Sequence, residues 1–366
     1  MSSTTSCGNY TRTVRNDTVY LAGASLSQRE EETSVSGLHE FVILAASVPA
    51  IVDTHYAGHR CNTVLNTGSY RIGSGASFTV RGLPPDCPHP SAAYVAIKTP
   101  KVSDSMRAAC RELRILSHPP LRSHRNIVEL LGIAWAPEPS LESASLLPVL
   151  VLELSSAGSL EDAWAGKSSP DPDISIATSE AKIGLCLDVA RGLKALHDCD
   201  VVHGDMKCQN ILLFKDDTVP GGLVAKLADF GHSVTELDER ESLRGNTPPW
   251  NAPEDNGDLN FIGLKAADIY SLGFVLWRIL AAGAHPFQVI TGTGTMLDPD
   301  VIEMMKREEP MVNLMLSLLG ERNDFFHWII LKKSVGAVLF GSIHPNPMVR
   351  SLRNVVNCLD SLVVNM

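Results

Sequence analysis

The chain has 366 residues, of which 44% are hydrophobic and 20% are charged, a balance typical of a soluble globular protein with enough length to bury a core. Its formal net charge of -10 argues against nucleic-acid binding through a broad basic surface. The 8 cysteines show neither a C-x-x-C pair nor a zinc-like spacing with histidine, so we expect free thiols in a reducing compartment rather than a disulfide framework.

The first 65 residues match no pattern that we can name, and we treat 1–65 as an N-terminal extension of unknown role. The polar stretch 1–13 lacks the apolar run of a secretory signal. The longest early apolar stretch, 41–52, is interrupted by Ser47 and Pro49 and is too short to cross a bilayer. We therefore expect no membrane anchor and an intracellular, cytoplasmic protein.

Residues 66–154 carry the pattern of a small lobe with an antiparallel sheet and one helix. Strands at 70–73 and 78–80 flank a glycine-rich turn and predict a hairpin. Apolar residues recur at helical spacing in 104–117, and the prolines that follow end this helix. Further strands are predicted at 93–98, 127–134 and 149–154.

Residues 155–360 are expected to form a larger, mostly helical lobe. The amphipathic pattern of 180–198 predicts a helix, and 266–282 is apolar on nearly every face, which favours a helix buried inside the lobe. We expect a loop at 168–173 and further helices in the tail from 301 to 366.

Five short motifs follow one another along this chain. They are a glycine-rich loop at 72–80, Val-Ala-Ile-Lys at 95–98, His-Gly-Asp-x-x-x-x-Asn at 203–210, Asp-Phe-Gly at 229–231 and Ala-Pro-Glu at 252–254. In this order they resemble the eukaryotic protein kinase family, over about residues 66–359. The resemblance implies a two-lobed α+β kinase fold that uses ATP and Mg²⁺ to phosphorylate a protein substrate.

The resemblance assigns the phosphate end of the nucleotide site to the glycine-rich loop and the Val-Ala-Ile-Lys strand. Gly73 and Gly75 would let backbone amides approach the phosphates, because glycine places no Cβ in the way. Lys98 would reach the α- and β-phosphates, and its partner carboxylate is Glu112 by family position. The full set assigned to nucleotide binding is Ile72, Gly73, Ser74, Gly75, Val80, Ala96, Lys98, Leu152, Glu153, Ser155, Leu212 and Asp229.

The adenine end of the site follows from the same resemblance. Val80 and Ala96 would roof the base, and Leu212 would form the floor beneath it. Leu152 occupies the gatekeeper position. Residues 153–155 resemble the hinge, whose backbone groups would hydrogen-bond the adenine edge.

The catalytic groups come mainly from the loop at 203–210. Asp205 would accept the proton of the substrate hydroxyl, while Asn210 and Asp229 would ligate Mg²⁺. Lys207 would contact the γ-phosphate, and together with Thr247 it matches the serine/threonine-specific pattern. The set assigned to catalysis is Asp205, Lys207, Asn210, Lys98 and Glu112.

Other matched positions are expected to be structural. Glu254 should pair with Arg350, and breaking this buried ion pair should cost several kcal/mol. Cys208 is interpreted as a small residue that fills the catalytic loop rather than as an oxidisable thiol. Asp268 would anchor the base of a hydrophobic column between the lobes, formed by His203, Phe230, Leu116 and Leu130.

The chain departs from the family pattern at two positions. Phe78 stands where the third loop glycine is expected, which should stiffen the loop tip and raise the Michaelis constant for ATP. Gly204 replaces the arginine that normally receives a phosphate on the activation segment. We therefore expect activity without activation-segment phosphorylation, retained when Ser233, Thr235 and Ser242 are replaced by alanine.

Two other functions remain open at this point. Small-molecule phosphotransferases of the aminoglycoside and choline kinase type share the His-Gly-Asp-x-x-x-x-Asn motif, but the Ala-Pro-Glu motif and Thr247 suit a peptide platform. A pseudokinase that binds without catalysis is the other alternative, although the residues assigned to the chemistry are all present. The identity of the substrate, the upstream regulator and the oligomeric state stay open.

Overall fold

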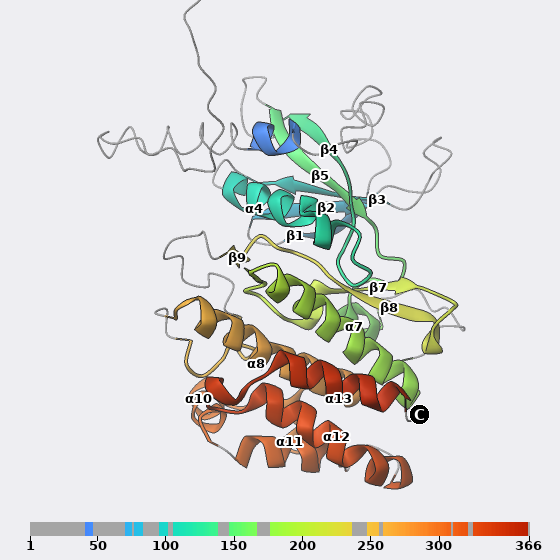
Figure 1. Ribbon diagram of the computed structural model, residues 1–366, viewed down its shortest axis with the longest axis vertical. Helices are drawn as coiled ribbons and strands as arrows, with labels where there is room; N and C mark the ends of the chain where they lie inside the picture. Colours follow the sequence, from blue (N-terminus) through green and yellow to red (C-terminus); the bar gives the residue numbers. More distant parts are fainter. Residues whose placement is uncertain are drawn as a thin grey trace, which may run out of the picture.

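A computed structural model describes residues 41–46, 70–74, 77–82, 95–101, 105–137, 146–166, 176–235, 247–255, 259–308, 310–320 and 325–364. The predicted loop at 168–173 lies outside these residues, as do Gly75 and Ser242. The described part forms a small lobe with one sheet and a larger lobe of helices, stacked along the long axis of the molecule (Figure 1). This is the two-lobed α+β architecture that the sequence predicts.

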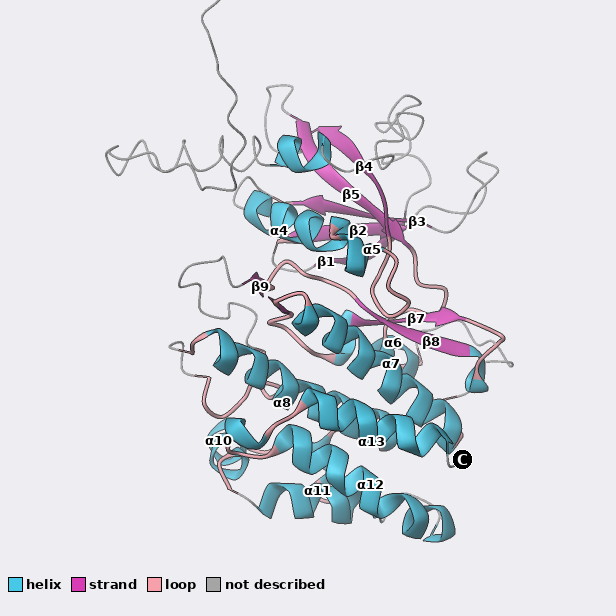
Figure 2. Cartoon of the chain, viewed as in Figure 1, coloured by secondary structure: helices cyan, strands magenta, loops and turns pink. Residues whose placement is uncertain are grey.

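The small lobe is built from strands with one long helix beside them. Its elements are β1 (Tyr70–Ser74), β2 (Phe78–Gly82), β3 (Val95–Pro100), α4 (Met106–Ser117), α5 (Pro119–Arg122), β4 (Leu130–Pro137) and β5 (Leu146–Glu153). The strands form one antiparallel sheet in the order β1-β2-β3-β5-β4, with α4 beside it (Figure 2). The predicted hairpin is therefore confirmed, and the register sets Val80 opposite Lys98 and Ala96 opposite Leu152.

The predicted strand at 127–134 begins too early. Ile127 forms a bridge with Leu227, and the Val128 N–H donates to the Leu227 carbonyl at 2.9 Å. These two residues therefore tie the small lobe to the large one, and the sheet strand β4 starts only at Leu130. The helix prediction was closer, because α4 ends at Ser117; Pro119 then opens the short helix α5 at a position where its missing N–H costs nothing.

The large lobe contains most of the helices and two small two-stranded sheets. Its elements are α6 (Leu160–Trp164), α7 (Ser179–Asp198), β6 (Val201–Val202), η2 (Cys208–Asn210), β7 (Ile211–Lys215), η3 (Pro220–Gly222), β8 (Leu223–Leu227), β9 (Val234–Thr235), α8 (Phe261–Leu280), α9 (Pro286–Val289), α10 (Pro299–Lys306), α11 (Pro310–Gly320), α12 (Phe325–Ile343), η4 (Pro347–Val349) and α13 (Leu352–Val364). The β7–β8 pair lies between the sheet of the small lobe and the helices below (Figure 1).

Helix α8 is the central buried helix of the large lobe. The sequence predicts it at 266–282, whereas it runs from Phe261 to Leu280, because the Asn260 side chain accepts the Gly263 N–H and caps an earlier start. Bulky side chains such as Tyr270 and Trp277 are fully buried, which explains why the helix is apolar on nearly every face. Among the residues described, no helix is both long and apolar enough to span a membrane.

Candidate active site

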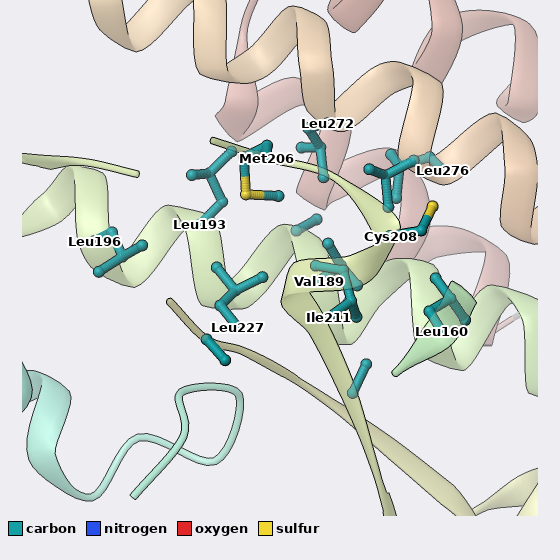
Figure 3. Close-up of a cluster of buried hydrophobic side chains, with 14 of the residues drawn as sticks. Leu160, Val189, Leu193, Leu196, Met206, Cys208, Ile211, Leu227, Leu272 and Leu276 are labelled. Carbon is teal, nitrogen blue, oxygen red and sulfur yellow. The ribbon is translucent and has the colours of Figure 1, made fainter. Parts of the chain in front are cut away.

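The loop at 203–210 is fixed from below by apolar and polar anchors. Met206, Cys208 and Ile211 turn into the core between α7 and α8 (Figure 3), and each is no more than 2% exposed. Burial raises the pKa of the Cys208 thiol to about 12, so the interpretation of this residue as a loop filler rather than a reactive thiol fits the structure. With these apolar side chains buried on one side of the loop, its polar side chains lie on the other side.

Asp268 of α8 holds the start of the same loop. Its carboxylate accepts the His203 N–H at 2.6 Å and the Gly204 N–H at 2.9 Å, and it also contacts His197 Nε2 at 3.0 Å. Gly204 has a φ of 79°, in the left-handed region that glycine adopts without strain. The His203 ring packs against Phe230 with a centroid distance of 5.4 Å.

Four polar side chains meet above the loop. Lys207 Nζ lies 2.6 Å from Asp205 Oδ2, and the Thr247 hydroxyl donates to Asp205 Oδ1 at 2.8 Å. The Asn210 amide nitrogen donates to the Asp205 carbonyl at 2.8 Å and to its Oδ2 at 3.1 Å. Asp205 is only 6% exposed, and the three donors hold its carboxylate in one orientation.

A second polar cluster joins the two lobes. Lys98 of β3 is 5% exposed, and its ammonium group contacts Glu112 Oε2 at 2.6 Å and Asp229 Oδ1 at 2.8 Å. Glu112 belongs to α4 and is fully buried, whereas the Asp229 side chain is 43% exposed. The Arg111 guanidinium, next to Glu112, donates to the Gly231 carbonyl at 2.8 Å. Helix α4 is thus bonded to the Asp-Phe-Gly motif.

The two polar clusters are continuous through the backbone. The Ala228 N–H donates to the Asn210 carbonyl at 3.0 Å, which sets Asp229 beside the end of the catalytic loop. Asp229 has a φ of 66°, an uncommon conformation for a residue with a side chain. Such strain is found where surrounding contacts fix a residue for a function. The bonds from Lys98 are contacts of this kind.

The ionisation of the second cluster follows from burial and mutual attraction. Burial acts to lower the pKa of Lys98, but Asp229 and Glu112 together leave that pKa above its ordinary value. Burial acts to raise the pKa of Asp229, but the attraction and hydrogen bond of Lys98, together with the attraction of His203 and His232, outweigh burial and lower that pKa to about 2. The pKa of Glu112 is raised, because burial there outweighs Lys98. Asp229 is therefore an ionised oxygen donor at neutral pH.

The donor set around Asp229 fits Mg²⁺. Asn210 turns its amide nitrogen to Asp205, which leaves its amide oxygen to coordinate a cation. Asp229 offers a half-exposed carboxylate. The described ranges hold no group of three or more His, Cys, Asp or Glu side chains that could form an all-protein metal cage. One carboxylate with one amide suits Mg²⁺, which takes its remaining ligands from phosphates and water.

Three of the residues assigned to the adenine pocket share one face of the sheet. Ala96 of β3 lies opposite Leu152 of β5, and Val80 of β2 lies on the same face opposite Lys98, two residues farther along β3. Leu212 of β7 is half-buried. An added Cβ on Gly73 would meet no atom within 4 Å, so internal packing does not require glycine there. Ile72 is 47% exposed beside it, and Ser74 ends β1.

The hinge side chains are engaged elsewhere. Glu153 is bonded to Lys226 of β8 at 2.6 and 2.8 Å, and its backbone N–H donates to the Glu129 carbonyl at 3.1 Å. The Ser155 hydroxyl donates to the Gly158 and Leu213 carbonyls at 2.8 and 2.6 Å. Any hydrogen bond from these two residues to an adenine base must therefore come from their backbone. For Glu153 only the carbonyl is left, because its N–H is already bonded to Glu129.

The segment 247–255 is anchored by a lysine that sequence reasoning missed. Lys306, at the end of α10, is fully buried, and its ammonium group donates to Asn251 O at 3.1 Å, Asn251 Oδ1 at 2.8 Å and Glu303 Oε1 at 2.7 Å. Burial lowers its pKa despite Glu303. The Ser271 hydroxyl holds the neighbouring Trp250 carbonyl at 2.8 Å. No local pattern marks this lysine, because lysine is expected on the surface.

The end of this segment carries the ion pair that the sequence predicts. Arg350 bonds both carboxylate oxygens of Glu254, with a 2.9 Å contact from Nη2 to Oε2. The Arg350 side chain is fully buried and lies over the Tyr270 ring, 4.6 Å from the ring centroid. The predicted pairing is confirmed.

Comparison with known proteins agrees with this geometry. A family model described as the protein kinase domain matches residues 69–336. The chain is 34% identical over 172 residues to serine/threonine/tyrosine-protein kinase HT1 of Arabidopsis thaliana, covering 46% of this chain and 38% of that protein. It is 31% identical over 216 residues to probable serine/threonine-protein kinase drkC of Dictyostelium discoideum, covering 55% and 26%.

A receptor is also among the similar proteins. The chain is 30% identical over 202 residues to ephrin type-A receptor 5 of Gallus gallus, covering 54% of this chain and 18% of that protein. In all three comparisons the matching part spans less than half of the relative's own length.

Proposed function

We propose that this chain, which belongs to the protein kinase family, transfers the γ-phosphate of ATP to serine and threonine hydroxyls of a protein substrate with the help of Mg²⁺. The observation that carries the proposal is a linked set of contacts: Lys98 bonds Asp229, the preceding Ala228 N–H bonds the Asn210 carbonyl, and the Asn210 amide bonds Asp205. These groups come from both lobes and from distant parts of the sequence, yet each has the chemistry that one step of phosphoryl transfer needs.

The roles follow from what each group can donate or accept. Asp205 accepts the proton of the attacking hydroxyl and orients it, and Lys207 places a positive charge where the transferred phosphoryl group develops negative charge. Lys98 binds the nucleotide phosphates, with Glu112 fixing its position. Asn210 and Asp229 hold Mg²⁺, which neutralises phosphate charge when bound.

The acceptor hydroxyl is proposed to belong to serine or threonine. The Thr247 hydroxyl bonds Asp205, the proposed catalytic base, and lies 3.3 Å from Lys207 Nζ. Thr247 therefore lies beside the place where the acceptor hydroxyl would bind. The similar proteins are named as both serine/threonine kinases and a serine/threonine/tyrosine kinase, so a direct assay decides the acceptor.

Activity is proposed not to require phosphorylation of the activation segment. Gly204 offers no charge to receive a phosphate, and the segment start is held by other means. The Ser233 hydroxyl is fully buried and donates to the His203 carbonyl at 3.0 Å, and the strand pair β6–β9 adds backbone bonds next to it. A kinase reaching Ser233 would first have to open this pairing.

The lobe boundaries are part of the same proposal. We assign 66–154 to the lobe that covers the nucleotide and 155–360 to the lobe that carries the acceptor site, with 1–65 as an extension of unknown role. Phe41 and Ala45 of that extension are buried in the main hydrophobic cluster, so at least this short stretch packs with the catalytic domain.

The test is phosphate transfer from labelled ATP to peptide libraries with a fixed serine, threonine or tyrosine, by wild type and Asp205→Asn. We expect incorporation into serine and threonine peptides, and a loss of at least a hundredfold in the variant. Nucleotide-dependent thermal stabilisation of the variant serves as the folding control. Transfer to kanamycin or choline instead of peptides would favour the small-molecule reaction. Binding of ATP without transfer to any acceptor would favour a pseudokinase.

A further inference from the structure

Phe78 occupies the position where the glycine-rich loop has its third glycine in the family. We propose that the Phe78 ring covers the Lys98 ammonium group and that the phosphates of a nucleotide must displace this ring to bind. Phe78 would then set how strongly the site distinguishes nucleotides from nucleosides. This inference rests on the nucleotide site proposed above.

The position of the ring follows from strand geometry. Side chains alternate along β2, so Phe78 lies on the same face as Val80, which is directly opposite Lys98 in the register. Phe78 is 5% exposed, and its ring centroid lies 4.4 Å from Lys98 Nζ. An added Cβ on Gly231 would lie 3.4 Å from the ring and 3.5 Å from Asp229 Oδ1. The ring thus spans from the glycine-rich turn to the Asp-Phe-Gly motif.

The hydrogen-bond capacity of Lys98 makes this contact consequential. An ammonium group has three N–H donors and no acceptor. Glu112 and Asp229 each accept one of them, and the Phe78 ring lies over the same ammonium group. A phosphate oxygen that is to bond Lys98 must therefore replace either the ring or one carboxylate. The ring is the weaker partner, because a charge-assisted hydrogen bond exceeds a cation–π contact.

This mechanism differs from the stiffening of the loop tip that the sequence suggests. Stiffening acts on the loop backbone and would affect any ligand beneath the loop. A cover over Lys98 acts only on ligands that carry phosphates, and leaves the adenine pocket at Val80, Ala96 and Leu152 unchanged. The two explanations therefore predict different responses to adenosine and to ATP.

The test compares adenosine, ADP and ATP binding by calorimetry in Mg²⁺ for wild type, Phe78→Gly and Phe78→Leu. Phe78→Gly should bind ADP and ATP roughly tenfold more tightly, the scale of one desolvated cation–π contact, with adenosine affinity changed by less than about threefold. Phe78→Leu fills the space without a π face, so its gain should be smaller. In peptide assays Phe78→Gly should lower KM for ATP.

A matched control is available on α8, where Lys265 Nζ lies 4.9 Å from the Phe261 ring centroid in the large lobe. Phe261→Leu removes a similar contact and should change no nucleotide affinity. The proposal is overturned if Phe78→Gly shifts adenosine and ATP equally, or shifts neither. If no variant binds any of the three ligands, the nucleotide site itself is refuted and the cover with it.

Discussion

Removing the carboxylate of Glu254 should destabilise the large lobe more than any surface charge does. The guanidinium group of Arg350 has five N–H donors, and all of them are used. Two bond Glu254, and the others bond the carbonyls of His344 at 2.7 Å, Ala266 at 3.1 Å and Pro345 at 3.1 Å. Glu254→Ala leaves a fully buried cation with two unsatisfied donors and no counter-charge.

The expected cost is about 3–5 kcal/mol, the range for breaking one partner of a buried ion pair. Because a domain is stable by only about 5–15 kcal/mol, this loss should shift the urea midpoint strongly, as followed by circular dichroism. Glu254→Gln keeps the shape and one acceptor and should cost less, about 1.5–3 kcal/mol.

The control is Asp198→Ala, which breaks an exposed i,i+4 pair with Lys194 and should cost at most about 1 kcal/mol. The double variant Glu254→Gln with Arg350→Met should recover part of the loss, because it leaves no unpaired buried charge. If Glu254→Ala costs no more than Asp198→Ala, the Glu254–Arg350 pair does not behave as a buried ion pair.

Three further predictions concern the substrate platform, acid stability and regulation. Lys306→Met should raise KM for a peptide about tenfold while KM for ATP stays constant in steady-state assays, because Asn251 loses its anchor; equal changes in both constants would contradict a platform role. Burial lowers the pKa of His285 to about 4, so between pH 6.5 and about 4 the unfolded chain binds more protons than the folded one, and stability falls as the pH is lowered. His285→Gln should flatten that dependence in thermal melts, and an unchanged slope would contradict it. Ser233→Ala should cost about 1 kcal/mol by leaving the His203 carbonyl unpaired, yet phosphatase-treated wild type and the Ser233/Thr235/Ser242 triple alanine variant should keep their activity; a collapse in either would show that a phosphate is needed.

Local sequence patterns predicted where strands and helices lie better than they predicted which segments those elements bond to. The hairpin of β1 and β2 followed from a glycine turn between alternating residues, which is information contained in a few neighbouring positions. Ile127 and Val128 read as ordinary strand residues, and only the packed lobes show that they bond Leu227 instead of the sheet. Strand ends of this kind depend on contacts that no local window contains.

The candidate site divides in the same way. The positions of Lys98 and Asp229 came from motifs, and the structure places the two side chains 2.8 Å apart, while their action on one ligand stays a prediction. The bond from Glu153 to Lys226 joins the hinge to β8, and neither residue's neighbours indicate it. Phe78 was noted as a missing glycine, but alternation alone could not reveal that its ring would lie over Lys98.

In the proposed function, Asp229 and Asn210 hold a metal-bound nucleotide against Lys98, and everything else depends on this contact. It is tested most directly by measuring ATP affinity by calorimetry with Mg²⁺ and with a chelator, for wild type and Asp229→Asn. We predict that Mg²⁺ tightens ATP binding to wild type at least about tenfold and has no effect on the variant, because the ionised donor is gone. Equal strengthening of ATP binding by Mg²⁺ in both proteins, or no ATP binding by wild type, would show that Asp229 does not hold the metal-bound nucleotide.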